Sequence, residues 1–225
     1  MKTLFTEFIA NTARKAIVVF AHLITAVRAN WQGVEPIQRR RIYYANHRSH
    51  GDFVLIWTAL PPNLRDRTRP VAGSDYWLKG KLKSFIGQQV FNAVLIDRKS
   101  RNDIEGAQIE HNPIQQMAEA LEDGYSLILF PEGTRNTTDE QLLPFKSGLF
   151  HLLEQVSDVE VVPVWIDNLN HVMPKGEIVP VPLLCSVTFG EPVPVIEGEK
   201  KAQYLARATA SLLTLAPIEA GAINE

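Results

Sequence analysis

A histidine and an aspartate five positions apart are the residues of this sequence whose chemistry is easiest to recognise. His47 and Asp52 lie between the apolar run Ile42–Tyr44 and a second apolar run, Phe53–Leu60. The first run predicts a buried strand and the second a helix. Both side chains therefore fall in a strand-to-helix turn, where α/β proteins usually keep their chemistry.

This pair is suited to general-base catalysis. Histidine exchanges a proton near neutral pH because its reference pKa is about 6.5, and a carboxylate on one ring nitrogen fixes the tautomer. The sequence places no serine in a Gly-x-Ser-x-Gly elbow, the turn that exposes a nucleophile in many hydrolases. We therefore expect a dyad of His47 and Asp52 whose nucleophile is a hydroxyl group of the substrate.

Two other interpretations of the same turn remain open. A histidine–aspartate pair at this spacing often has a purely structural role. His47, His50 and Asp52 are also possible metal ligands, but no second histidine cluster completes such a site. We therefore expect no metal.

Two arginines follow other predicted strands. Arg98 comes two positions after the end of the apolar run Val90–Ile96, and Arg135 follows the run Tyr125–Phe130. Guanidinium groups bind phosphate well through forked N–H donors, although a single arginine at a strand end is often only solvated. Together with the dyad, they indicate a phosphorylated alcohol as substrate.

The loop that contains Arg135 offers further groups for a ligand. Glu132 is expected to accept hydrogen bonds from a polyol hydroxyl, and Gly133 to let a ligand approach the backbone closely.

Strands alternate with helices along the chain, which predicts a layered α/β fold with a central, mostly parallel sheet flanked by helices. If the strands before the three polar turns are parallel neighbours, these turns share one edge of the sheet and form one cleft. Pro163 predicts an edge strand or a bulge. The expected strands are 42–44, 68–73, 90–96, 125–130, 159–166 and 183–189, and the expected helices are 53–60, 75–87, 113–123, a helix ending near 156, and 200–215.

Composition narrows the class of protein. The chain has 225 residues, of which 45% are hydrophobic and 21% charged, enough for one large domain with a sizeable core. A net charge of −2 gives no overall reason to expect nucleic acid as a partner. The single cysteine, Cys185, lies in an apolar run, which excludes an intramolecular disulfide, fits a reducing compartment and predicts a small core residue.

Residues 1–40 are predicted to form an N-terminal amphipathic, interfacial helical segment, residues 41–216 the α/β domain, and residues 217–225 a loosely ordered tail. The longest uncharged run, Ala16–Val27, is shorter than the about 20 residues that span a bilayer. A helix packed on the domain's own core is the alternative.

Charge near the N-terminus favours a membrane surface. Seven basic and two acidic residues lie between Met1 and Arg41, and Trp31 is a candidate interface anchor. We expect a peripheral or monotopic protein on the cytoplasmic face of the membrane. The lysines at 79, 81 and 83 form a solvated face, or meet lipid headgroups or the phosphates of a carrier.

The sequence resembles the glycerolipid acyltransferases, the lysophosphatidic acid acyltransferase family, in four blocks that occur in the family's order. A further segment, Phe145-Lys146-x-Gly148, resembles one that often follows the third block. The blocks are Asn46-His47-x4-Asp52, Val94-Leu95-Ile96-Asp97-Arg98, Phe130-Pro131-Glu132-Gly133-Thr134-Arg135 and Val162-Pro163-Val164.

The resemblance implies a reaction and its partners. His47 is expected to act as general base on the acceptor hydroxyl, with Asp52 orienting it. Arg98 and Arg135 are expected to bind the acceptor phosphate. Glu132, Gly133 and Thr134 complete the expected binding loop.

The implied donor is an acyl thioester of acyl-carrier protein or coenzyme A. The implied acceptor is a lysophospholipid, 1-acyl-glycerol-3-phosphate, and the product is phosphatidic acid, with no bound cofactor. An acyltransferase acting on another lysolipid, such as a lyso-aminolipid, and a non-catalytic lipid-binding module remain alternatives.

Overall fold

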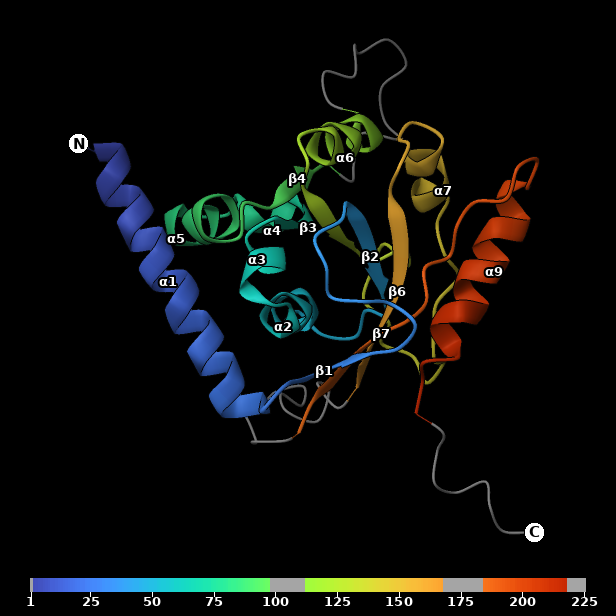
Figure 1. The fold of residues 1–225 in the computed structure, drawn as a ribbon. Coiled ribbons are helices and arrows are strands. Elements are labelled where there is room, and N and C mark those ends of the chain that lie inside the picture. Colours follow the sequence, from blue (N-terminus) through green and yellow to red (C-terminus); the bar gives the residue numbers. More distant parts are fainter. Residues whose placement is uncertain (1, 98–111, 168–183, 218–225) are drawn as a thin grey trace.

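The computed structural model describes residues 2–97, 112–167 and 184–217 (Figure 1). Within these ranges seven strands form one sheet in the order β1-β7-β6-β2-β5-β3-β4. Each strand pair is parallel except β6 with β7. This confirms the predicted α/β class. The strands are β1 (Arg28–Trp31), β2 (Arg41–Ala45), β3 (Thr68–Gly73), β4 (Val94–Ile96), β5 (Ser126–Leu129), β6 (Glu160–Asp167) and β7 (Ser186–Phe189).

Helices cover both faces of the sheet and give three layers (Figure 1). One face packs against α1 and α2 around Tyr43, Ile56 and Val162. The other face packs against α6, α7 and α9 around Ile42 and Leu121. The helices are α1 (Lys2–Thr25), α2 (Asp52–Ala59), α3 (Pro62–Arg65), α4 (Ser74–Trp77), α5 (Lys81–Phe85), the π-helix η1 (Ile86–Val90), α6 (Pro113–Glu122), α7 (Gly148–Leu153) and α9 (Lys201–Leu213).

The two central strands that lead into the predicted site are buried on both faces. Every residue of β2 and of β5 is buried, as expected for parallel strands covered by helices on each side. β2 pairs directly with β5, with Tyr44 opposite Leu129. The turns that follow these strands therefore leave the sheet side by side at its carboxyl edge.

Two predicted elements differ from the structure because of local backbone geometry. The helix predicted over 75–87 is divided into α4, α5 and the first residues of η1, and Gly80 between α4 and α5 has φ +91°. The strand predicted over 90–96 begins only at Val94. Val90 still belongs to η1, and Asn92 adopts φ +48°. Apolar periodicity alone does not distinguish a buried irregular helix from a strand.

The prediction that Pro163 marks an edge strand or bulge was wrong about the edge, since β6 lies between β7 and β2. Pro163 accepts the N–H of Gly190, which follows the last residue of β7. The backbone N and C=O of one strand residue point to the same side. The N–H that proline lacks would thus face Gly190, beyond the last residue of β7.

The N-terminal segment is helical over α1 but also contributes β1 to the sheet. β1 pairs with β7, and Trp31 stacks on Phe189 with ring centroids 4.0 Å apart. Trp31 therefore packs partly against the core, and its role as an interface anchor stays a prediction. The division of the chain at residue 40 stays a prediction. β1 lies before this boundary and yet belongs to the sheet.

Two of the basic residues counted toward a lipid surface are bound by the domain. Arg41 is 1% exposed, and its guanidinium group contacts the Glu160 carboxylate at 2.8 Å. The guanidinium group of Arg39 contacts the same carboxylate at 2.9 Å. One carboxylate therefore offsets part of the combined charge of these two arginines.

Candidate active site

His47 and Asp52 form the predicted dyad. The Nδ1 atom of His47 lies 2.8 Å from the Oδ2 atom of Asp52, whose side chain is 2% exposed. A carboxylate accepts hydrogen bonds only, so Nδ1 carries the proton and Nε2 keeps its lone pair. The imidazole is thus held in the tautomer of a general base.

The turn between β2 and α2 is folded around the Asp52 carboxylate. Besides the imidazole, Oδ2 accepts the backbone N–H groups of Arg48 and Ser49 at 2.7 and 2.8 Å. Asp52 is also the first residue of α2, where the helix dipole stabilises a negative charge. One buried oxygen therefore fixes both the loop and the ring.

The loop after β5 holds the histidine from the other side. The Oε1 atom of Glu132 accepts the backbone N–H of His47 at 2.7 Å, and the backbone N–H of Asn136 donates to the carbonyl of His47 at 2.6 Å. The imidazole stacks on the ring of Phe130 with centroids 4.1 Å apart. Backbone and ring of His47 are thus both positioned by this loop.

The geometry of Glu132 differs from the substrate contact expected of it. The residue is 2% exposed, and its Oε2 atom accepts the backbone N–H of Leu143 at 2.8 Å. Burial raises the pKa of the Glu132 carboxyl, and the two backbone N–H donors oppose this rise. Both oxygens are therefore engaged within the protein, and Glu132 positions His47 instead of facing a ligand.

Gly133, Thr134 and Arg135 line a cavity beside His47, but Gly133 does not leave open space there. Its φ is +70°, and a Cβ atom on it would lie 2.7 Å from Cδ and 2.9 Å from Nζ of Lys146. The lysine chain therefore fills the space on the Cβ side of Gly133, and close approach of a ligand to its backbone stays a prediction. Arg98, the other predicted phosphate ligand, lies outside the described residues.

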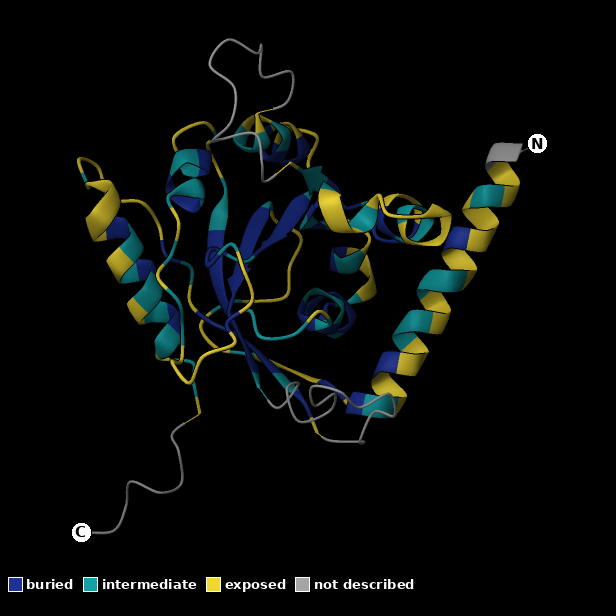
Figure 2. Ribbon diagram, turned by 180° about the vertical axis from the view of Figure 1, so that it is seen from behind, coloured by how far each residue is buried: buried dark blue, intermediate teal, exposed yellow. Residues whose placement is uncertain are grey.

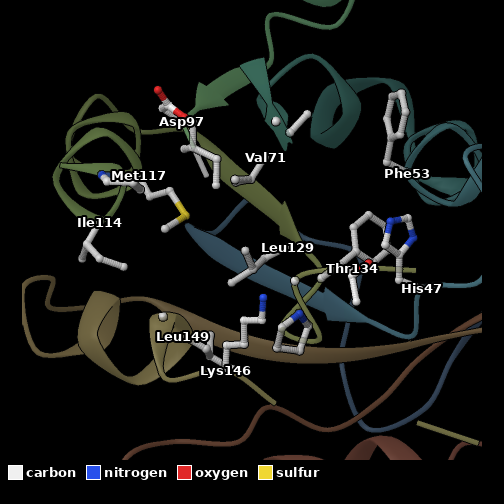
Figure 3. Close-up of a pocket in the computed structure, with 18 of the residues that line it drawn as sticks. His47, Phe53, Val71, Asp97, Ile114, Met117, Leu129, Thr134, Lys146 and Leu149 are labelled. Carbon is white, nitrogen blue, oxygen red and sulfur yellow. The ribbon is translucent and has the colours of Figure 1, made fainter. Parts of the chain in front are cut away.

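The cavity has a volume of about 1210 Å³, larger than the about 300–1,000 Å³ of most small-molecule sites. Figure 3 shows His47 and Thr134 at one end, Lys146 between, and the apolar side chains of Met117 and Leu149 at the other. The cavity therefore runs from the dyad past apolar side chains (Figure 3) to a far end that also carries polar groups, among them Asp97, Gln115 and Glu154. Further apolar lining comes from Val71, Ile96, Ile114 and Leu129.

His50 lines the same cavity as His47. Its ring stacks on Tyr76 with centroids 5.4 Å apart. Desolvation lowers the pKa of His50, and the charge of Arg135 lowers it further, which places Arg135 near this ring. Over the described ranges, no group of three or more His, Cys, Asp or Glu side chains is arranged to hold a metal ion.

Sequence reasoning gave no role to two residues that shape this site, Phe130 and Lys146. Both belong to segments that resemble family blocks, which was the available signal. The contact of Phe130 with His47 and of Lys146 with Gly133 depends on how the loop after β5 folds back, since the backbone N–H of Lys146 donates to the carbonyl of Pro131 at 2.8 Å.

Known proteins share this sequence pattern and fold. A 1-acyl-sn-glycerol-3-phosphate acyltransferase of Limnanthes douglasii is 35% identical over 68% of this chain and 50% of its own length. One from Haemophilus influenzae is 32% identical over 56% of this chain and 47% of its own. The chain thus spans about half the length of these curated relatives.

The fold is also that of a solved structure. The crystal structure of the 1-acyl-sn-glycerophosphate acyltransferase from Thermotoga maritima matches with a TM-score of 0.62 and 21% identity, over 94% of this chain and 84% of that one. The family model described as Acyltransferase matches residues 28–167, which include the dyad and the loop after β5. These residues make up more than half of the chain, and the protein belongs to the Acyltransferase family.

Proposed function

We propose that this protein transfers a fatty acyl group from an acyl-carrier protein or coenzyme A thioester to the free hydroxyl of 1-acyl-sn-glycerol-3-phosphate, giving phosphatidic acid. The observation that carries the proposal is the 2.8 Å contact between His47 Nδ1 and Asp52 Oδ2 at the cavity. The names of the relatives support the choice of acceptor.

In the proposed reaction, Nε2 of His47 takes the proton of the acceptor hydroxyl as its oxygen attacks the thioester carbonyl carbon. The tetrahedral intermediate then collapses, the C–S bond breaks, and the imidazolium returns the proton to the leaving thiolate. Asp52 stabilises the imidazolium during this interval. The reaction needs no metal or bound cofactor in this scheme.

Cations near the dyad would hold the acceptor's phosphate. Arg135 lines the cavity and Arg98 follows β4 in sequence, and both are assigned to phosphate binding. Gly133 and Thr134 shape the wall beside the glycerol. The apolar side chains along the cavity, Met117 and Leu149 among them, suit a hydrocarbon chain.

Association with the cytoplasmic membrane surface is part of the proposal. The segment Leu4–Thr25 of α1 is long and apolar enough to cross a membrane by length and composition. However, α1 packs along η1 and α2, and Arg14 donates to the carbonyls of Gln89 and Val90 at 2.8 and 2.6 Å. A helix held sideways against the domain in this way favours a monotopic arrangement. Its exposed surface includes the large apolar side chains of Leu4, Phe5, Phe8, Val19, Phe20 and Leu23.

The decisive experiment measures thiol release and product formation with a panel of lysolipids and both donor types. Wild-type protein is expected to prefer 1-acyl-glycerol-3-phosphate, whereas preference for a lyso-aminolipid would change the acceptor, and no thiol release with any pair would reject the enzyme. His47→Ala is expected to lower kcat by about 10²–10⁴ with an unchanged fold. Asp52→Asn should lower kcat similarly, because it permits the wrong tautomer.

A separate measurement tests the membrane part. Phe8→Ser, Phe20→Ser and Leu23→Ser together should reduce sedimentation with vesicles, and unchanged sedimentation would assign the anchor elsewhere. Substitution is preferable to deleting residues 1–30, because this deletion would remove most of β1 from the sheet.

A further inference from the structure

A second surface, distinct from α1, combines exposed leucines with unpaired lysines. Leu78 and Leu82, on the segment that spans α4 and α5, are 50% and 71% exposed. Lys79 and Lys81 are also exposed and make no hydrogen bond or ion pair with any described residue. We call Leu78–Lys83 the Leu/Lys patch.

The charge of this region is one-sided. Between Ser74 and Val90 the chain contains three lysines and one acidic residue, Asp75. Lys83 lies over the ring of Tyr76, with its Nζ atom 4.1 Å from the ring centroid. By contrast, Arg39 and Arg41 of the N-terminal segment are paired with Glu160. The patch therefore carries a local excess of positive charge.

The patch borders the mouth of the cavity. Asp75, Tyr76 and Trp77 line the cavity and are followed directly by Leu78. The Tyr76 ring stacks on His50 of the dyad's own turn. A ligand that leaves a surface in contact with the patch would thus meet the cavity mouth without crossing water.

The patch and α1 lie on the same side of the sheet (Figures 1 and 2). η1 continues from α5 and packs on α1, and Arg14 of α1 is bonded to the last residues of η1. The exposed apolar side chains of α1 therefore lie on the same side as the exposed leucines and lysines of the patch.

We propose that the Leu/Lys patch is a second membrane contact that binds anionic lipid and sets the cavity mouth against the bilayer surface. Apolar side chains enter the interface while adjacent lysines attract anionic headgroups. Positive charge alone would fit either a lipid surface or an acidic protein. The exposed leucines among the lysines favour the lipid surface. The proposal relies on the proposed function only in placing the acceptor in the membrane.

The test compares two variants of the full-length chain. The patch variant carries Leu78→Ser, Lys79→Gln, Lys81→Gln and Leu82→Ser, all at exposed positions that do not line the cavity. The control variant carries Lys200→Gln and Lys201→Gln, which remove the same charge from the start of α9, across the sheet from α1 (Figure 1).

The first readout is sedimentation with vesicles of phosphatidylcholine alone or with anionic phosphatidylglycerol. A lysine near an anionic surface contributes about fivefold in binding, the equivalent of about 1 kcal/mol. The patch variant should therefore lose at least about tenfold in affinity for anionic vesicles, and the control variant should match wild type. Unchanged affinity of the patch variant, or an equal loss in the control, would overturn the proposal.

The second readout separates lipid from carrier protein and does not depend on vesicle binding. The wild type and the patch variant are expected to bind acyl-carrier protein in solution with equal affinity. If the patch variant lost affinity for acyl-carrier protein but not for vesicles, the patch would be assigned to the donor carrier and the lipid contact rejected. Activity toward a soluble short-chain lysolipid should be unchanged, and activity toward vesicle-borne lysolipid should fall. Absence of activity in wild type would reject the proposed function, while sedimentation would still test the patch.

Discussion

A carboxylate oxygen of Glu132 accepts the backbone N–H of His47 at 2.7 Å, although the two residues are 85 positions apart in the chain. The other oxygen of Glu132 binds the N–H of Leu143. One buried side chain thus connects the turn after β2 to two points of the loop after β5. The position of the general base depends on this connection.

Glu132→Gln should lower both stability and turnover. The neutral amide leaves one backbone N–H with an uncharged acceptor and turns an NH₂ donor toward the other, and the lost charged hydrogen bond costs about 1.5–3 kcal/mol in the free energy of unfolding. Displacement of His47 should lower kcat by about 10- to 100-fold. Urea unfolding and steady-state kinetics measure these effects.

Glu122→Gln is the matched control, since Glu122 is exposed on α6. It should change neither quantity. If Glu132→Gln raised only the acceptor KM, this result would instead support the substrate contact predicted from the sequence.

Arg135→Ala should raise the KM for a phosphorylated acceptor by about tenfold or more, because a charged hydrogen bond is lost. The KM for the thioester donor should stay unchanged. The pKa of His50 should rise, since desolvation remains but the repulsion from Arg135 is removed. Proton NMR titration of the histidine resonances measures this shift.

Arg67→Ala provides the comparison for Arg135. Arg67 is exposed and precedes β3, at the opposite edge of the sheet from the cavity. An Arg135→Ala variant with altered donor affinity and an unchanged acceptor KM would reassign Arg135 to the donor.

Gly133→Ala should destabilise the fold for two separable reasons. The backbone at φ +70° costs about 1–2 kcal/mol with any side chain, and the new methyl group meets Lys146 at 2.7 Å. In a Lys146→Ala background the second part disappears, so the two substitutions should couple by at least about 0.5 kcal/mol. Urea unfolding of the four proteins measures this coupling.

Gly124→Ala isolates the backbone part. Gly124 has φ +84°, and no atom lies within 4 Å of a Cβ built on it. Its effect should therefore be independent of Lys146. Strict additivity of Gly133→Ala and Lys146→Ala would show that the lysine chain moves away without cost.

Cys185 should react slowly in the folded protein. The residue is 2% exposed, and burial raises the pKa of its thiol to about 11. At pH 8 only about one thiol in a thousand is ionised, and this fraction rises as the pH approaches 11. Iodoacetamide labelling followed by mass spectrometry should be slow without denaturant and fast in urea. Rapid labelling of the folded chain would contradict the assignment of Cys185 as a core residue.

The strands nearest the site were predictable because their burial is visible in the sequence. Tyr43 and Ile128 belong to short apolar runs bounded by polar turns, which indicates a strand covered on both faces. Parallel pairing then required the turns after β2 and β5 to meet. The position of His47 and Arg135 at one cavity follows from these two facts.

Other features of the site depend on contacts that local sequence does not encode. Nothing near Glu132 in the chain indicates that its carboxylate binds backbone N–H groups at His47 and Leu143. Likewise, the approach of Lys146 to Gly133 requires the loop between them to fold back. The segment after Trp77 departed from prediction because Gly80 adopts a backbone conformation that periodicity does not report.

The long-range bonds at His47 also bear on synthesis of the protein. Its N–H and its carbonyl are each bound by residues made much later, Glu132 and Asn136. A nascent chain released or stalled before this point holds its imidazole on a loop that lacks both partners. Catalytic competence should therefore appear late in translation, after the fifth strand and its loop have left the ribosome.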